Sequence, residues 1–210
     1  MSEAIIHPMG DVVRYRPPAA RRETTAMMGM VLFLGAWAMM FAVLFIAYGF
    51  MRARLMSWPP PGVPALPWKL PLGNTLVLAL SSASYQLGVR EVRAGRSGRS
   101  GRSGRAGPWL LGAALLGALF VALQGVLWHT MYQNDLAPWS AGAYSSVFYG
   151  LTWLHAAHAV VGIGGVGTVA VRALLGAYSA ARHLPIKLWG LYWHFVGAVW
   201  VLMFVTIFLM

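Results

Sequence analysis

The sequence predicts an all-α membrane protein whose five helices cross the bilayer, with the amino terminus inside and the carboxyl terminus outside. Three observations predict this fold: the composition, five long uncharged stretches, and the distribution of basic residues. Of the 210 residues, 59% are hydrophobic and only 10% are charged, whereas a water-soluble domain carries about 25% charged residues. There are too few polar residues to cover a globule in water, so lipid must surround much of the surface.

The uncharged stretches define one membrane domain, residues 26–210, which follows a polar cytoplasmic tail, residues 1–25. A helix needs about 20 mostly apolar residues to cross the hydrocarbon core, and five stretches free of Asp, Glu, Lys and Arg satisfy this. The predicted spans are residues 26–51, 70–89, 109–133, 145–171 and 188–210. The segment WPPPGVPALPWKLP separates the first two spans, because its prolines prevent continuous helix.

Basic residues set the predicted orientation. Thirteen of the 16 Lys and Arg residues lie in the amino-terminal tail and in the loops after the second and fourth spans. Only Arg52, Arg54 and Lys69 lie on the other side. Under the positive-inside rule this bias places the amino terminus in the cytoplasm. The net charge of +11 is therefore interpreted as facing anionic lipid headgroups, and nucleic-acid binding is not expected.

The loop at residues 93–107 contains the repeat GRSGRSGRSGRAG. It offers no apolar side chain for packing, so we expect a flexible tether. The alternative is contact with lipid headgroups or a partner. The candidate residues for headgroup contact are Arg96, Arg99, Arg102 and Arg105.

Acidic residues are few and lie outside the predicted helix interiors. All five fall in tails, in loops or at a span end: Glu3, Asp11, Glu23, Glu91 and Asp135. Ion-coupled carriers usually place a carboxylate deep in the membrane, so this distribution weighs against autonomous proton or sodium coupling. The chain has no cysteine, which excludes disulfides and thiolate metal sites.

The fourth span has the most polar interior. Thr152, His155 and His158 follow one another at steps of three residues and therefore share one helix face. Such a polar face should contact another helix rather than lipid. The candidates for helix packing or for a lipid cleft, on four spans, are Thr152, His155, His158, Asn74, Ser81, Gln124 and His194. His155 and His158 could share a metal ion, but haem needs opposed ligands at one depth, and neither His129 nor His194 matches. We expect no catalytic residue, metal or cofactor in this chain.

At these residues the chain resembles subunit III of the haem-copper respiratory oxidases. The motifs that carry the resemblance are PLGNTLVLALSSAS, LGALFVALQ, SSVFYGLTWLHAAHAVVG and LYWHFVGAVWVLMF, in chain order. The family pattern has acids where this chain has Trp37, Leu127 and Gly197. Trp153 and Ala156 replace two of its glycines. The chain is therefore similar to a divergent, bacterial-type five-helix form.

The resemblance implies an accessory, non-redox subunit of a terminal oxidase that reduces O2 to water in aerobic respiration. Haem and copper would belong to partner subunits, with subunit I and subunit II bound beside this chain. Phospholipid would fill a cleft between helices, and the complex would lie in the bacterial inner membrane. Two alternatives remain open: a related helper of a nitric oxide reductase, and a small transporter or channel. An odd number of spans without an internal repeat disfavours transport.

Overall fold

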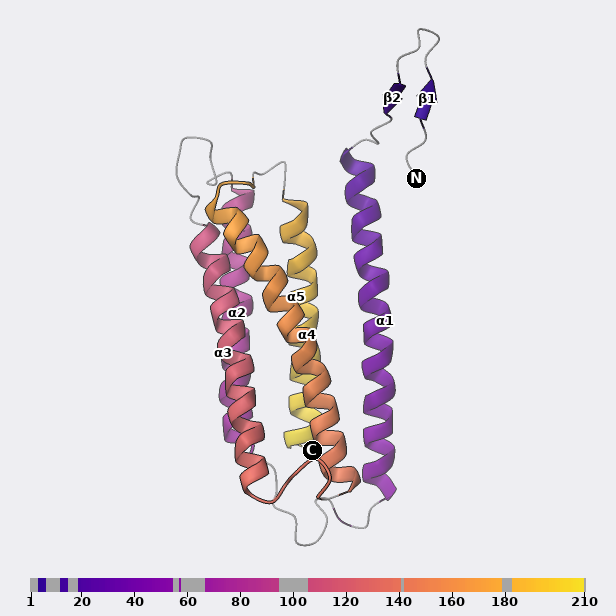
Figure 1. Ribbon diagram of the computed structural model, residues 1–210, viewed down its shortest axis with the longest axis vertical. Helices are drawn as coiled ribbons and strands as arrows, with labels where there is room; N and C mark the ends of the chain where they lie inside the picture. Colours follow the sequence, from indigo (N-terminus) through magenta and orange to yellow (C-terminus); the bar gives the residue numbers. More distant parts are fainter. Residues whose placement is uncertain are drawn as a thin grey trace.

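The computed structural model describes residues 4–6, 12–14, 19–54, 57, 67–94, 106–140, 142–178 and 183–209. Within these residues the chain forms a bundle of five long helices that alternate in direction (Figure 1). The helices are α1 (Ala19–Arg54), α2 (Lys69–Arg93), α3 (Ala106–Gln133), α4 (Ala143–Leu174) and α5 (Leu184–Met203). A π-helical segment, η1 (Phe204–Leu209), continues α5. In the amino-terminal tail, β1 (Ala4–Ile6) pairs antiparallel with β2 (Val12–Arg14).

Each predicted span lies inside one of these helical segments, up to the last described residue, and the helices extend further. α1 begins at Ala19, within the predicted polar tail, and Thr25 Oγ1 donates to the carbonyl of Arg21 at 2.9 Å in its first turns. α2 and α3 both extend into the predicted loop 93–107. The rest of that loop lies outside the described residues. The headgroup candidates outside the described residues are Arg96, Arg99, Arg102 and Arg105.

The polytopic helical bundle is confirmed. Four helices, α1, α3, α4 and α5, are long and apolar enough to cross a membrane. α2 has 25 residues, about 37 Å at 1.5 Å per residue, which is long enough to span. Its apolar character is lowered by Asn74, Ser81 and Ser84, and all three side chains are buried within the bundle. That α2 is the fifth span stays a prediction.

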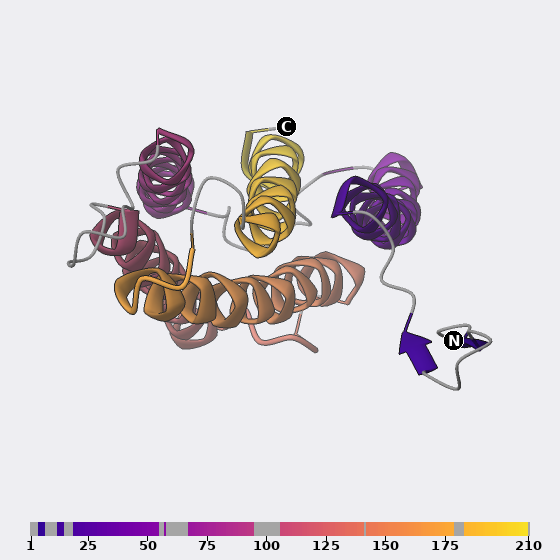
Figure 2. The same ribbon diagram turned by 90° about the horizontal axis from the view of Figure 1, so that it is seen from above.

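The helices pack in an order that leaves α1 at the edge. α2 packs on α3 and α3 on α4, whereas α5 contacts α4, α2 and α1. Seen from above, α5 lies between α2 and α1 (Figure 2). Only 11% of the most apolar part of α1 is buried within the molecule, against 39% to 50% for α3, α4 and α5. α1 begins at one end of the bundle and η1 ends near the other (Figure 1), and the predicted orientation in the membrane rests on the charge bias.

Candidate functional site

Trp193 of α5 joins three other helices at the centre of the bundle. Its indole is fully buried, and Nε1 donates to Ser81 Oγ of α2 at 3.1 Å. Ser81 Oγ in turn donates to the carbonyl of Ala113 in α3 at 2.7 Å. The ring lies against Gly117 of α3 and Gly162 of α4, where an added Cβ would be 2.7 and 2.8 Å from ring atoms. The two glycines therefore make the space that the indole occupies.

Other aromatic side chains bind α5 to α2 and α4 in the same way. Trp200 Nε1 donates to Thr75 Oγ1 at 2.9 Å, and Tyr85 OH donates to the carbonyl of Ile186 at 2.6 Å. The Trp189 ring covers Gly165 so closely that a Cβ there would overlap it. Buried polar donors of aromatic residues normally find an acceptor, and here the acceptors lie on neighbouring helices.

Thr152 lies at the contact between α3 and α4. It is fully buried, accepts a hydrogen bond from Trp128 Nε1 at 3.0 Å and donates to the carbonyl of Phe148 at 2.8 Å. Close by, Tyr149 OH donates to the carbonyl of Leu136 at 2.8 Å. These bonds connect the end of α3 and the following turn to the first half of α4.

His155 is enclosed by aromatic rings from three other helices. Its ring centroid lies 6.4 Å from that of Phe41 in α1, 6.0 Å from Phe120 in α3 and 5.4 Å from Trp200 in α5. The side chain is 1% exposed. Among the described residues nothing hydrogen-bonds to its Nε2. The surroundings of His155 are therefore those of a core residue.

His158, one turn further along α4, faces α1. Its Nδ1 lies 2.6 Å from the carbonyl of Leu154, so Nδ1 carries the hydrogen and donates it. The Trp37 ring of α1 stands edge-on to the imidazole with centroids 3.8 Å apart, and Phe41 is at 5.5 Å. Tyr192 OH of α5 donates to the His158 carbonyl at 3.0 Å. In the described part of the chain, no three His, Cys, Asp or Glu residues are grouped to hold a metal.

Asn74 and Gln124 form a buried amide pair between α2 and α3. Asn74 Nδ2 donates to Gln124 Oε1 at 3.4 Å. The remaining amide atoms, Asn74 Oδ1 and Gln124 Nε2, have no partner among the described residues. His194 lies elsewhere, partly exposed on α5, with its Nε2 2.6 Å from the donating Nε2 of Gln86. The seven candidates are thus distributed over several helix contacts and do not converge on one site.

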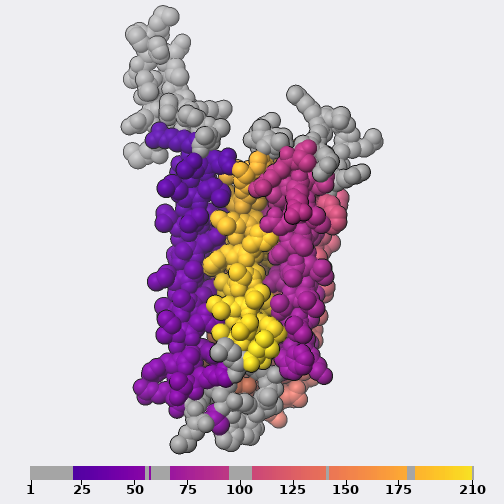
Figure 3. Space-filling view, turned by 180° about the vertical axis from the view of Figure 1, so that it is seen from behind, coloured from indigo at the N-terminus to yellow at the C-terminus, as the bar shows by residue number. Residues whose placement is uncertain are grey.

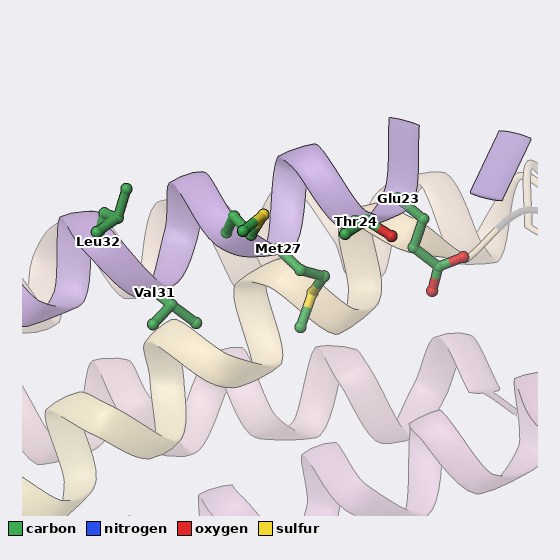
Figure 4. Close-up of a pocket in the computed structure, with 6 residues that line it drawn as sticks. Glu23, Thr24, Met27, Val31 and Leu32 are labelled. Carbon is green, nitrogen blue, oxygen red and sulfur yellow. The ribbon is translucent and has the colours of Figure 1, made fainter. Parts of the chain in front are cut away.

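A hollow of about 650 Å³ follows the first turns of α1. Figure 4 shows Met27 directed toward α5 and Leu32 on the opposite side of the helix. At one end of the hollow, Glu23 forms an ion pair with Lys187 of α5, which ties the start of α1 to the bundle. The remaining described lining is Thr24, Met28 and Val31.

The bundle and its interior contacts can be set beside known families. A family model described as cytochrome c oxidase subunit III matches residues 20–210. The chain belongs to the cytochrome c oxidase subunit III family. The match covers all five helices, so the chain is a multi-pass membrane protein and an accessory subunit III of a haem-copper oxidase, and it associates with other oxidase subunits.

Relatives from several bacteria are similar over most of their length. The chain is 30% identical over 199 residues to the probable cytochrome c oxidase subunit 3 of Nocardia farcinica, which covers 95% of both chains. It is 32% identical over 185 residues to cytochrome c oxidase subunit 3 of Synechocystis sp., covering 88% of this chain and 75% of that one. It is 30% identical over 202 residues to the probable subunit 3 of Mycobacterium leprae, again covering 95% of each.

The three positions where the resemblance places family acids are apolar here and lie in different places. Trp37 contacts the imidazole of His158, as described above. Leu127 is fully buried in α3. At Gly197 the nearest atom to an added Cβ would be Ser82 Oγ at 3.7 Å, so a Cβ would fit there in ordinary van der Waals contact. The bundle therefore packs at these three positions without the carboxylates of the family pattern.

Sequence reasoning missed the residues that join the helices most directly, Trp193, Trp200 and Tyr85. A partial signal was present, because Ser81 was among the predicted candidates for helix packing. Which aromatic ring enters which gap depends on the arrangement of the helices, and a single sequence does not contain that arrangement.

Proposed function

We propose that this chain stabilises the catalytic subunit I of the oxidase, together with subunit II, and that it retains phospholipid at its surface. In this proposal haem and copper belong to the partner subunits. The observation that supports it is the packing around His155 and His158. Aromatic rings from α1, α3 and α5 surround these imidazoles, so their role is to hold helices together, with no part in redox chemistry.

The surface of α1 supports a role in contact with lipid or a neighbouring subunit. Large apolar side chains project from it along its whole length, such as Leu32, Met39 and Ile46, which are 75%, 69% and 71% exposed. Within a bilayer such a surface is covered by acyl chains or by another helix. The bacterial relatives support an inner-membrane location, and the charge bias supports a cytoplasmic amino terminus.

Copurification tests the proposal. The chain, tagged at its carboxyl end, is extracted from native membranes in mild detergent, and the copurifying proteins are identified by mass spectrometry. We expect subunits I and II, with haem and copper in the visible spectrum of the complex. An unrelated inner-membrane protein with the same tag gives the background. Recovery of nitric oxide reductase subunits, or of this chain alone, would contradict the proposal.

A deletion strain tests the stabilising role separately. Without this chain, the oxidase should start turnover at a near-normal rate and lose activity faster than the complete complex. Expression of the wild-type chain should restore the lifetime. An oxidase that lasts equally long with and without the chain would rule out stabilisation as its function.

A further inference from the structure

An aromatic hollow lies where α3 ends and α4 begins. The helices form two layers (Figure 2): α1, α5 and α2 make the face seen in Figure 3, and α3 and α4 make the other layer. The hollow has a volume of about 350 Å³ and is lined by the last turns of α3, the turn that follows and the first half of α4. The aromatic residues of its described lining are Trp128, Tyr132, Trp139, Tyr149 and Trp153.

Hydrogen bonds hold the inner walls of the aromatic hollow in place. Trp128 Nε1 donates to Thr152 Oγ1, and Tyr149 OH donates to the carbonyl of Leu136, as described above. The Trp153 ring contacts both walls: its centroid lies 6.2 Å from that of Trp128 with the planes at 89°, and 5.3 Å from that of Tyr149 at 59°. The three rings meet at steep angles and form a corner. Because the polar ends of two of them are satisfied within the protein, their ring surfaces remain available for a ligand.

The rim of the aromatic hollow is exposed. Tyr132 is 56% exposed, Trp139 75% and Trp153 49%. Aromatic residues at the ends of membrane helices commonly serve as interfacial anchors, and exposure alone would suit that role. Anchoring does not require five aromatic side chains to converge on one hollow, whereas the aromatic cages that bind organic cations do. Trp153 also stands where the family pattern has glycine, so this wall is a feature of this chain rather than of the pattern.

The part of the bundle around the hollow has no basic residue. The sequence contains no Lys or Arg between Arg105 and Arg172, so neither α3, the turn nor the first half of α4 supplies a cation. Asp135 lies in that turn with its side chain exposed. His129 Nε2 accepts a hydrogen bond from Gln133 Nε2 at 2.9 Å, so this imidazole is neutral. The faces of aromatic rings carry partial negative charge. The rings and the carboxylate together are therefore complementary to a cation.

We propose that the aromatic hollow receives an arginine side chain of a protein that docks on the extracytoplasmic side of the membrane. Arginine fits better than lysine, because its flat guanidinium stacks on aromatic rings and is more weakly hydrated. A hollow of about 350 Å³ is at the lower end of the range of ligand pockets, which suits one long side chain. The exposed rim supplies apolar contact around it, and Trp, Tyr and Arg are the residues that dominate the energy of protein interfaces. The inference goes beyond the proposed function, and the side of the membrane rests on the orientation predicted from the charge bias.

Saturation-transfer difference NMR on the purified oxidase complex in neutral detergent tests the chemistry of the hollow, because it detects weak ligands of large complexes. The probes are N-acetyl-arginine amide and N-acetyl-citrulline amide, which have nearly the same shape and differ in charge. The test variant is Trp153→Leu. The matched control is Trp68→Leu, which removes an indole that is equally exposed at 49%, at the start of α2 and outside the described lining of the hollow.

We expect the wild-type complex to bind the arginine probe about two- to fivefold more tightly than the citrulline probe, which is the effect of an exposed cation–π contact. Trp153→Leu should remove this preference, and Trp68→Leu should keep it. Trp153→Phe should retain most of it, because an aromatic face remains, and it decides the matter if the leucine variant does not assemble. Equal binding of the two probes by the wild type, or loss of the preference in both leucine variants, would overturn the inference. Subunits I and II are quantified in every preparation, so a failure of the proposed function is seen separately.

A photocrosslink tests whether the occupant is a protein. The photoreactive amino acid p-benzoylphenylalanine takes the place of Trp139 at the rim, intact cells are irradiated, and the linked residues are identified by mass spectrometry. We expect a link to an extracytoplasmic protein segment within a few residues of an arginine, and a weaker link when Trp153→Leu is added. The same amino acid in place of Trp68 gives the background. Links to lipid alone, links to protein segments without arginine, or no link at all would overturn the docking proposal and leave interfacial anchoring as the role of these rings.

Discussion

Alanine at Gly162 tests the packing of Trp193 directly. The new methyl carbon would lie 2.8 and 2.9 Å from two ring carbons of Trp193 and 3.1 Å from a ring carbon of Tyr192. The indole cannot move away easily, because Gly117 contacts it from α3 and its Nε1 is bonded to Ser81. Overpacking of this kind costs about 1–3 kcal/mol, whereas Ala in place of Gly gains about 0.5–1 kcal/mol in a helix. We expect a net loss of about 1–2 kcal/mol.

Gly164→Ala is the matched control on the same helix. No atom lies within 4 Å of an added Cβ there, so only the helix-propensity gain should remain. The measurement is unfolding of the purified chain in mixed micelles by added SDS, followed by circular dichroism. Trp193→Phe should recover part of the loss in the Gly162→Ala background, because the smaller ring lacks some of the clashing atoms. If Gly162→Ala is as stable as Gly164→Ala, the reasoning about this contact is refuted.

Three further predictions concern orientation, the arginine repeat and the histidines. With no native cysteine, single cysteines at Ser100 and Ser140 can be labelled in intact cells with an impermeant thiol reagent. Only Ser140→Cys should react, and the reverse pattern would overturn the orientation. Replacing residues 95–105, which leaves Ala106 and Gly107 of α3 in place, by a shorter neutral Gly-Ser linker should leave copurification and turnover near normal once orientation has been checked, whereas loss of the partners would favour a headgroup or partner contact. His155→Ala with His158→Ala should keep haem and copper per subunit I unchanged while lowering yield, since both imidazoles pack against aromatic rings of other helices. A missing haem or metal in an assembled complex would disprove the packing role.

The positions of the helices could be predicted because the length and the lack of charge of a membrane span are properties of the segment itself. A charged side chain in the hydrocarbon core is costly, so long uncharged stretches mark the helices without any knowledge of their neighbours. The polar stripe of α4 was predictable for a similar reason. Residues at steps of three and four share a face, and Thr152, His155 and His158 are all buried on that face.

The ends of the helices were less predictable. α1 starts within the predicted tail and α3 begins at Ala106, inside the predicted loop. Helices extend past the hydrocarbon core into the headgroup region, where charged residues such as Arg21 and Arg93 are tolerated. A search for uncharged stretches therefore ends each predicted helix too early. It marks the part of the helix within the hydrocarbon core and leaves out the terminal turns, which carry charged residues.

The sequence by itself determined that the chain is a helical membrane protein, where its helices lie and which faces are polar, because each of these follows from the cost of exposing polar or charged groups to lipid. Only the tertiary structure decided which side chains meet. His158 faces Trp37 of α1, Ser81 accepts the hydrogen bond of Trp193, and Arg93 and Lys187 line one hollow. Helical periodicity specifies the direction of a side chain from its own axis, whereas its partner depends on the position, tilt and depth of another helix. Those quantities come from the packing of all five helices together.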